Sequence, residues 1–115
     1  MKNGEKETAI QSAILKYLQY QNIHAWRMNT TGTPIGNTGR FRANQNAGMA
    51  DIYCQMIVSG RPVPVWLEVK TSKGRQSPKQ KQFEETINEV GGFYYLVRSV
   101  DDVQDALKDV IKRLK

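Results

Sequence analysis

The sequence is poor in the residues that most often build metal and nucleophile sites, since it has one cysteine, Cys54, and one histidine, His24. A structural zinc ion takes four ligands, mostly cysteine and histidine, so this scarcity excludes such a site. It also disfavours histidine-dependent nucleases and Cys–His hydrolases. We expect Cys54 to be a buried, reduced side chain of the core. His24 is expected only to pack or to form a hydrogen bond.

Long apolar segments and targeting signals are missing as well. No run of about 18 apolar residues is present, so no membrane span is expected. The polar N-terminus, MKNGEKE, lacks the apolar part of a signal peptide, which favours a cytoplasmic protein. The length of 115 residues predicts one domain, residues 1–115, with a single core. The net charge of +6 favours a polyanionic partner.

The pattern of apolar residues predicts an α/β fold in which helices and strands follow the order α-β-β-β-α-β-α. Capping signals mark two of the helices. Ser77 at an N-cap, followed by Pro78, opens the second helix, and Gly91-Gly92 ends it. Ser99 caps the last helix. The expected helices span residues 5–20, 78–90 and 100–114, and the expected strands span residues 25–28, 52–58, 63–69 and 93–97.

The most informative segment is typical of one β-hairpin. Apolar residues fall on positions 52, 54, 56 and 58 and then on positions 63, 65, 67 and 69, which is the period-2 alternation of half-buried strands. A turn-like stretch over residues 59–62 joins the two runs. A one-residue slip would set core residues against polar ones, so the alternation selects one register. With an even-length turn centred on Ser59-Gly60, the facing pairs are Ile52 with Leu67, Cys54 with Val65, and Met56 with Val63.

This register sets two acidic side chains against each other. Asp51 lies directly opposite Glu68 on one face, with Cβ atoms about 5 Å apart, and Lys70 is two residues further along that face. Opposed carboxylates repel unless something positive lies between them, and a divalent cation is the natural candidate. The alternative is an ordinary solvent-facing strand whose Glu and Lys serve solubility. Trp66 falls on the same face, where it either borders the site or packs under a helix.

A glycine-rich stretch over residues 29–48 separates the first strand from the hairpin. Structureless segments of this length in a small domain are usually functional or mobile. Arg40-Phe41-Arg42 combines two guanidinium groups with a ring, which suits phosphate contact and stacking. The alternative is a disordered surface loop. A second basic cluster follows the hairpin and consists of Lys70, Lys73, Arg75, Lys79 and Lys81.

Further short motifs surround these features. They are Glu7-x-x-x-Gln11, Gly48-Met49-Ala50-Asp51, Glu68-Val69-Lys70, Gly74-Arg75-Gln76-Ser77-Pro78-x-Gln80-x-x-Phe83 and Val97-Arg98-Ser99. With these motifs the chain resembles, over nearly its whole length, the VRR-NUC branch of the PD-(D/E)XK nuclease superfamily. It resembles in particular the stand-alone, phage-type members of this branch, which are similar to Holliday-junction resolvases. Two positions depart from the pattern: Ala50 replaces a frequent Pro, and Ser99 replaces the second Arg of the Val-Arg-Arg signature.

The resemblance implies a restriction-endonuclease-like PD-(D/E)XK fold, with a central mixed β-sheet flanked by α-helices. It implies that Asp51 and Glu68 hold one or two Mg²⁺ ions, with the Val69 carbonyl as a further ligand and Mn²⁺ as a substitute metal. Glu7 is implied to contribute to the metal directly or through water. Its alternative role is an exposed acid that favours the dipole of the first helix. Lys70 is implied to orient the attacking water or to steady developing negative charge.

The glutamine of the second helix has two possible roles. The resemblance places Gln80 near the phosphate or the attacking water. The alternative is a capping box, in which the side chain of Gln80 bonds back to Ser77. We expect both roles to hold only if this side chain does not turn inward.

The resemblance therefore implies a Mg²⁺-dependent, structure-selective DNA endonuclease that cuts four-way junctions or flaps. The implied partners are branched DNA and a second copy of the chain, without a membrane or a small-molecule cofactor. The implied location is the cytoplasm of a bacterium or of a phage-infected host. The alternatives are a non-catalytic nucleic-acid-binding module of the same fold and a restriction-type duplex endonuclease. The side chains expected to contact DNA are those of Arg40, Arg42, Lys73, Arg75 and Lys79.

Overall fold

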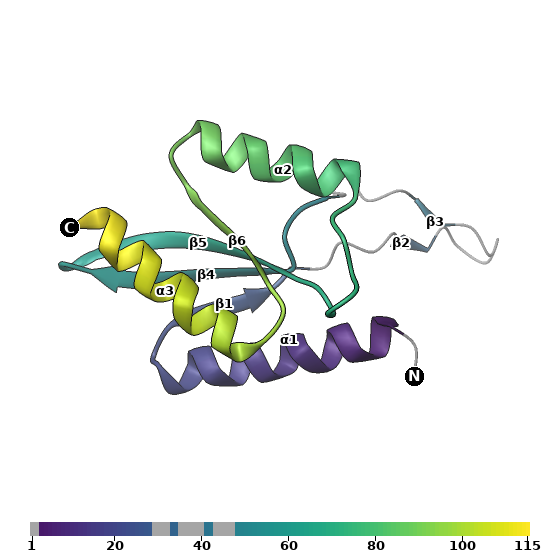
Figure 1. Ribbon diagram of the computed structural model, residues 1–115, viewed down its shortest axis with the longest axis horizontal. Helices are drawn as coiled ribbons and strands as arrows, with labels where there is room; N and C mark the ends of the chain where they lie inside the picture. Colours follow the sequence, from purple (N-terminus) through teal and green to yellow (C-terminus); the bar gives the residue numbers. More distant parts are fainter. Residues whose placement is uncertain (1–2, 29–32, 35–40, 43–47) are drawn as a thin grey trace.

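The computed structural model describes residues 3–28, 33–34, 41–42 and 48–115, which form a mixed sheet with helices on both faces (Figure 1). The four strands of this sheet lie in the order β1-β4-β5-β6, and only the β5–β6 pair is parallel. Among the described helices, none is long and apolar enough to span a bilayer. The elements are α1 (Asn3–Tyr20), β1 (His24–Arg27), β2 (Thr33–Pro34), β3 (Phe41–Arg42), β4 (Ile52–Val58), β5 (Arg61–Val69), α2 (Pro78–Glu89), β6 (Phe93–Val97) and α3 (Val100–Leu114).

The predicted fold class and the order of the long elements are confirmed. The first helix begins two residues earlier than expected, and the first strand is shifted by one residue. The stretch over residues 29–48, expected to lack regular structure, contains β2 and β3, which pair antiparallel. Strands of two residues are too short to leave a periodic signal in the sequence, which explains why they were missed.

The β4–β5 hairpin has the predicted register, because its two sets of apolar residues face the same core. Its turn is formed by Ser59 and Gly60, which both have positive φ angles, 52° and 78°. This geometry belongs to the two-residue turns that match the twist of antiparallel strands. Arg61 and Pro62, expected in the turn, belong instead to β5. The pairs that confirm the register are Ile52 with Leu67, Cys54 with Val65, and Met56 with Val63.

The hydrophobic core lies between one face of the sheet and helices α1 and α3, which contact each other. In Figure 1, α1 runs below the strands and α3 crosses them obliquely. Cys54 is fully buried in this core, and burial raises the pKa of its thiol to about 12. It is therefore the inert core side chain that the sequence predicts. Leu114, expected in the apolar stripe of α3, is 47% exposed because it is the last residue of that helix. The fully buried apolar residues include Ile14, Leu18, Ile52, Val65, Leu67, Val69, Val103 and Val110.

Helix α2 lies on the opposite face of the sheet and forms the crossover between the parallel strands β5 and β6 (Figure 1). Its start is the predicted capping box. The Ser77 hydroxyl accepts a hydrogen bond from the Gln80 backbone N–H at 3.2 Å, and the Gln80 side chain accepts one from the Ser77 N–H at 2.8 Å. Pro78 occupies the first helical position. The crossover thereby sets the N-terminus of α2 beside the end of β5.

Candidate functional site

Asp51 is held between the end of β1 and the end of β5 by hydrogen bonds from two backbone N–H groups. It directly precedes β4, and its carbonyl oxygen accepts a hydrogen bond from the Met28 N–H at 2.7 Å. Its carboxylate oxygen Oδ2 accepts one from the Val69 N–H at 2.8 Å. Asp51 is only 9% exposed. The confirmed register and these bonds place its carboxylate next to Glu68, on the sheet face that the alternation predicts.

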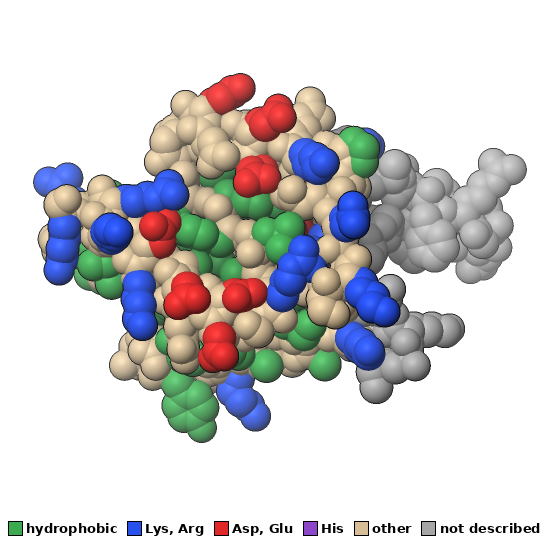
Figure 2. All heavy atoms as spheres, in the orientation of Figure 1, with side chains coloured by type: hydrophobic (Ala, Val, Ile, Leu, Met, Phe, Trp, Pro, Cys, Tyr) green, Lys and Arg blue, Asp and Glu red, His purple; other side chains and the backbone are tan. Residues whose placement is uncertain are grey.

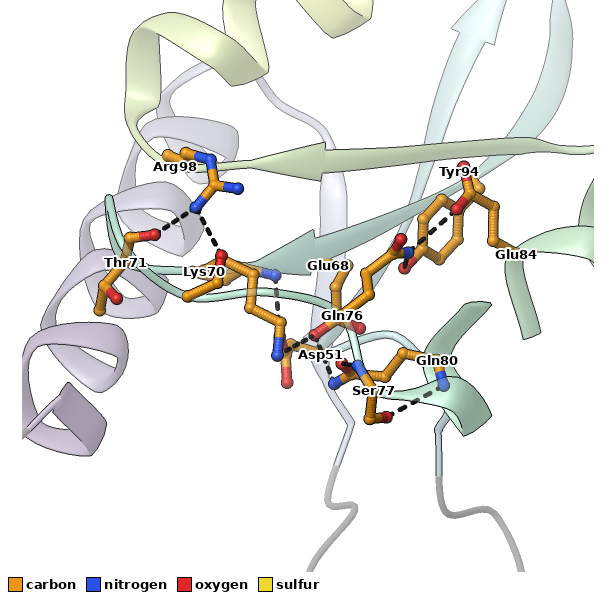
Figure 3. A network of polar contacts seen from close by, with 12 residues as sticks. Asp51, Glu68, Lys70, Thr71, Gln76, Ser77, Gln80, Glu84, Tyr94 and Arg98 are labelled. Atoms are coloured by element: carbon orange, nitrogen blue, oxygen red, sulfur yellow. Dashed lines mark hydrogen bonds and ion pairs between the residues drawn. The ribbon is translucent and has the colours of Figure 1, made fainter. Parts of the chain in front are cut away.

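Glu68 is a fully buried carboxylate with an oxygen that is not satisfied. Its Oε2 accepts a hydrogen bond from Gln80 Nε2 at 3.0 Å and lies 3.8 Å from Lys70 Nζ. Figure 3 shows these three side chains pointing toward one another. Within the described part of the chain, Oε1 has no hydrogen-bond partner. A buried polar atom left unpaired costs about 1–3 kcal/mol, so an orphaned oxygen beside a second carboxylate is a fitting ligand for a cation.

The electrostatics of Glu68 point the same way. Burial raises its pKa, contact with and repulsion from Asp51 raise it further, and Lys70 offsets only part of this rise, so that the pKa is about 9. At neutral pH the carboxyl group then holds a proton unless another positive charge takes the place of that proton. Glu68 and Asp51 could hold a divalent cation, which would supply such a charge and would displace the proton.

Gln80 forms the predicted capping box, and its side chain also reaches Glu68. Its amide oxygen Oε1 accepts the hydrogen bond from Ser77 that completes the capping box, while its Nε2 donates to Glu68. The two ends of one amide serve different partners, so the capping box does not keep this side chain from Glu68, and the role of Gln80 near a phosphate or an attacking water stays a prediction. The cap therefore fixes the orientation of the amide and aims its N–H group into the site.

Glu7 approaches the site from α1. Its side chain is half-buried, and burial raises its pKa, with a further rise from Asp51 and a decrease from Lys70. Among the described residues, however, no three His, Cys, Asp or Glu side chains lie close enough together to hold a metal ion. The paired carboxylates are thus the candidate direct ligands of a cation, and Glu7 interacts with Asp51 through its charge.

Positive charge lies near this site on the surface. Lys73, Arg75 and Lys79 are exposed and lie between the end of β5 and the first turn of α2. Figure 2 shows Lys and Arg side chains gathered over this side of the molecule. Arg40 lies outside the described residues, and for Arg42 the structure gives only the backbone, in β3. The predicted role of these two arginines therefore stays a prediction.

Arg98 supports the site although the sequence did not single it out as a site residue. Its guanidinium Nη1 donates to the backbone carbonyls of Thr71 and Gly74, the latter at 3.0 Å. These bonds hold the turn that follows Lys70 (Figure 3). The neighbouring Ser99 caps α3, as predicted. The one available signal was the place of Arg98 in the Val-Arg-Ser motif.

Gln76 is a second supporting residue that sequence reasoning missed. Its Nε2 donates to the Glu84 carboxylate at 3.0 Å and to the Tyr94 hydroxyl at 2.9 Å. These bonds tie the segment before α2 to that helix and to β6. The pKa of Tyr94 is raised by burial, so its hydroxyl stays neutral and accepts the bond.

Fold and site together define an α/β protein with a buried carboxylate pair, an ammonium group and a fixed amide at one end of its central sheet. No family model matches the sequence, and no curated protein matches it. One similar solved structure, named "VRR_NUC domain", has a TM-score of 0.63 at 18% identity, over 90% of this chain and 95% of that one.

A second similar structure, named "VRR_NUC domain protein", has a TM-score of 0.60 at 17% identity, over 92% of this chain and 88% of that one. At these identities the likeness establishes the fold. The chain therefore has the fold of these VRR_NUC domains, as its sequence motifs predict.

Proposed function

We propose that this chain is a nuclease of the VRR-NUC family that hydrolyses phosphodiester bonds in DNA with the help of Mg²⁺. The observation that carries the proposal is the environment of Glu68, which combines full burial, an unpaired oxygen and a neighbouring Asp51. A buried pair of carboxylates destabilises a fold unless positive charge offsets it. The likeness to two VRR_NUC domain structures supports the same function.

Mg²⁺ is the cation that the donor set favours. Asp51 and Glu68 supply hard carboxylate oxygens, and we propose the Val69 carbonyl as a further ligand and Glu7 as a contributor through water. Mn²⁺ has the same preference for oxygen ligands and substitutes for it. When bound, the ion supplies Lewis-acid polarisation of a phosphate and a water of lowered pKa.

The side chains around the carboxylates have separate tasks in this proposal. Lys70 carries its ammonium group 3.8 Å from Glu68 and donates to the attacking water or to the charge that develops on the phosphate. Gln80 is a positioning residue, because its capped amide fixes the carboxylate of Glu68. Lys73, Arg75 and Lys79 contact the phosphates of the DNA on either side of the cut.

The proposal includes a substrate and an assembly. A chain of 115 residues has limited surface with which to hold DNA, and two copies provide two sites and twice the basic surface. We therefore propose a homodimer of the phage type that acts in the cytoplasm and selects branched DNA, such as a four-way junction or a flap.

Cleavage of labelled DNA tests this function. A four-way junction, a flap and a linear duplex of matched sequence are incubated with Mg²⁺, Mn²⁺ or EDTA. The proteins compared are the wild type, Lys70→Ala and a control, Lys108→Ala, which removes an equal charge from the exposed side of α3. We expect metal-dependent cutting of a branched substrate that Lys70→Ala loses and Lys108→Ala keeps.

Other outcomes separate the alternatives. Discrete fragments from the linear duplex, with the branched substrates left whole, would point to a restriction-type enzyme and overturn the proposed substrate. Binding that survives EDTA, with no cutting in either metal, would overturn hydrolysis and favour a recognition module.

A further inference from the structure

Aromatic side chains form a row across the sheet face that carries Asp51 and Glu68. Trp26 on β1, Tyr53 on β4 and Trp66 on β5 are cross-strand partners. The ring centroids are 5.9 Å apart between Trp26 and Tyr53 and 4.8 Å apart between Tyr53 and Trp66. At the β5 end, Phe83 of α2 packs edge-on against Trp66 at 5.1 Å, which closes that end of the row.

Within the described residues, the other end of the row lies at β1, which forms the edge of the sheet. The ring of Trp26 is nearly parallel to those of Tyr53 and His24, with interplanar angles of 28° and 24°. His24 is exposed, and Trp26 is 50% exposed. Near-parallel rings with an open indole at the sheet edge provide a flat surface on which another planar ring can stack. This contrasts with the tilted and edge-on contacts at the closed end.

Trp26 and Tyr53 lie next to the carboxylates on the same face of the sheet. Tyr53 is two residues after Asp51 on the same face, and the Met28 N–H that bonds to Asp51 belongs to the residue two after Trp26. Trp26 is thus a diagonal cross-strand neighbour of Asp51, and such neighbours are roughly 7–8 Å apart. This span is comparable with the length of one extended nucleotide.

We propose that Trp26, backed by Tyr53 and His24, is a stacking site for an unpaired nucleobase. The base belongs to the nucleotide next to the phosphate at Asp51 and Glu68, so this inference rests on the proposed function and adds a substrate class. The substrate is DNA with an unpaired base beside the cut. Aromatic stacking beside a basic surface is the combination that binds single-stranded nucleic acid without regard to sequence.

A nucleobase suits this face better than a second copy of the chain. A stable protein interface buries about 800 Å² on each partner around an apolar centre. Among the described residues, the large apolar side chains exposed on this face are only Trp26 and Ile57. Between Trp26 and Ile57 the face is polar, because Gln55 donates from its side-chain amide to the Tyr53 hydroxyl at 2.8 Å.

The test compares two flap DNAs that differ only in the single-stranded arm, which carries thymines in one and abasic nucleotides in the other. Affinities are measured in EDTA, so that no strand is cut. The proteins are the wild type, Trp26→Ala, Trp26→Phe and Tyr20→Ala. Tyr20 is the matched control, since it is an aromatic residue 80% exposed at the end of α1, away from the row.

We expect the wild type and Tyr20→Ala to bind the thymine arm about tenfold more tightly than the abasic arm. Trp26→Ala removes this preference, and Trp26→Phe, which restores a ring, keeps most of it. A wild type without the preference, or a Trp26→Ala variant that retains it, overturns the stacking site. If Trp26→Ala lowers both affinities equally and also converts a dimer into a monomer in sedimentation, the stacking site is overturned in favour of a protein interface.

Cleavage of the same flaps in Mg²⁺ distinguishes this inference from the proposed function. If the wild type cuts the flaps but shows no Trp26-dependent preference for the thymine arm, the stacking site is rejected and the nuclease function is kept. A preference that depends on Trp26, with no cutting, rejects hydrolysis and keeps the stacking site.

Discussion

Glu68 is the side chain on which the proposed chemistry depends most, because a proton and the proposed cation would compete for the same carboxylate. Its Oε2 is taken by Gln80 and Lys70, while Oε1 is unpaired within the described residues. One ammonium group at 3.8 Å does not neutralise two carboxylates. Asp51 is fixed by the Val69 N–H and cannot move away to relieve the repulsion. Charge balance at this point of the sheet therefore requires a second positive species.

The raised pKa of Glu68 predicts that, in EDTA, the protein loses stability as the pH rises. The pKa is about 9 in the folded protein, against an ordinary value of 4.5. Between these values the folded state holds a proton that the unfolded state has lost. The resulting stabilisation is complete below the lower value and disappears as the pH rises through the higher one. We expect the free energy of unfolding, measured with urea, to fall by a few kcal/mol over this range.

Glu68→Gln is the variant that isolates this effect, since it cannot titrate. Its stability should vary less with pH than that of the wild type, whereas Glu85→Gln, on the exposed side of α2, should keep the wild-type dependence. Saturating Mg²⁺ should flatten the wild-type curve, because the ion takes the place of the proton. Identical curves for the wild type and Glu68→Gln in EDTA would show that Glu68 does not carry the proton.

Two elements meet at Gly48, which brings the segment before Asp51 against the first turn of α2. Gly48 has a φ angle of +94°, and a Cβ atom at this position would lie 2.6 Å from the Lys79 carbonyl oxygen. Any side chain larger than hydrogen must therefore push the two segments apart. Since one segment carries Asp51 and the other carries Gln80, this contact sets the distance between the carboxylate of Asp51 and the amide of Gln80.

Gly48→Ala should accordingly impair the site as well as the fold. Gly60→Ala is the matched control, because Gly60 also has a positive φ, of +78°, but has open space around it. We expect Gly60→Ala to cost only the backbone strain of about 1–2 kcal/mol. Gly48→Ala should destabilise more in urea unfolding and should weaken Mn²⁺ binding, which Gly60→Ala leaves unchanged. Equal effects of the two variants on Mn²⁺ affinity would remove Gly48 from the positioning of the site.

The features that could be predicted from the sequence are those that depend on residues close together in the chain. The β4–β5 register follows from period-2 alternation, because one face of both strands is buried. The start of α2 follows from Ser77, Pro78 and Gln80, since an N-cap is a contact between near neighbours in the chain. The opposition of Asp51 and Glu68 follows from the register alone. For this reason the centre of the site was predictable without the fold.

The features that escaped prediction depend on contacts between distant segments. The hydrogen bonds from Arg98 to the turn after Lys70 join residues that are 24 and 27 positions apart in the sequence. The pairing of β1 with β4, which places Trp26 on the same face as Asp51, leaves no mark in a strand of four residues. The full burial of Glu68 depends on α2, whose position relative to the sheet the sequence did not specify.

At the scale of the whole molecule, the candidate site lies beside a basic surface. A second group of basic side chains lies on another element, α3. Lys73, Arg75 and Lys79 are exposed between the end of β5 and the start of α2. The polar side of α3 carries Lys108 and Lys112 together with Arg113, which pairs with Asp109. Both groups contribute to the net charge of +6, so charge alone does not tell which face would meet DNA.

Salt dependence distinguishes these two surfaces. Removing a cation that binds one phosphate should reduce the steepness of log affinity against log salt concentration by about 0.9 for duplex DNA. The combined variant Lys73→Ala, Arg75→Ala and Lys79→Ala should therefore bind DNA more weakly and with a flatter slope. Lys108→Ala with Lys112→Ala serves as the control and should keep the wild-type slope. A flatter slope in the control alone would assign DNA binding to α3.

Calorimetric titration of Mn²⁺ and Mg²⁺ into the EDTA-stripped protein tests the carboxylate pair most directly, since it needs no substrate. The variants are Asp51→Asn and Glu68→Gln, with Glu85→Gln as the control. We predict that the wild type and Glu85→Gln bind the ion and release a proton near neutral pH, seen as an enthalpy that depends on the buffer. Either substitution in the pair should weaken binding by at least about tenfold. Equal binding by all four proteins, or no binding by the wild type, would contradict a metal site at Asp51 and Glu68.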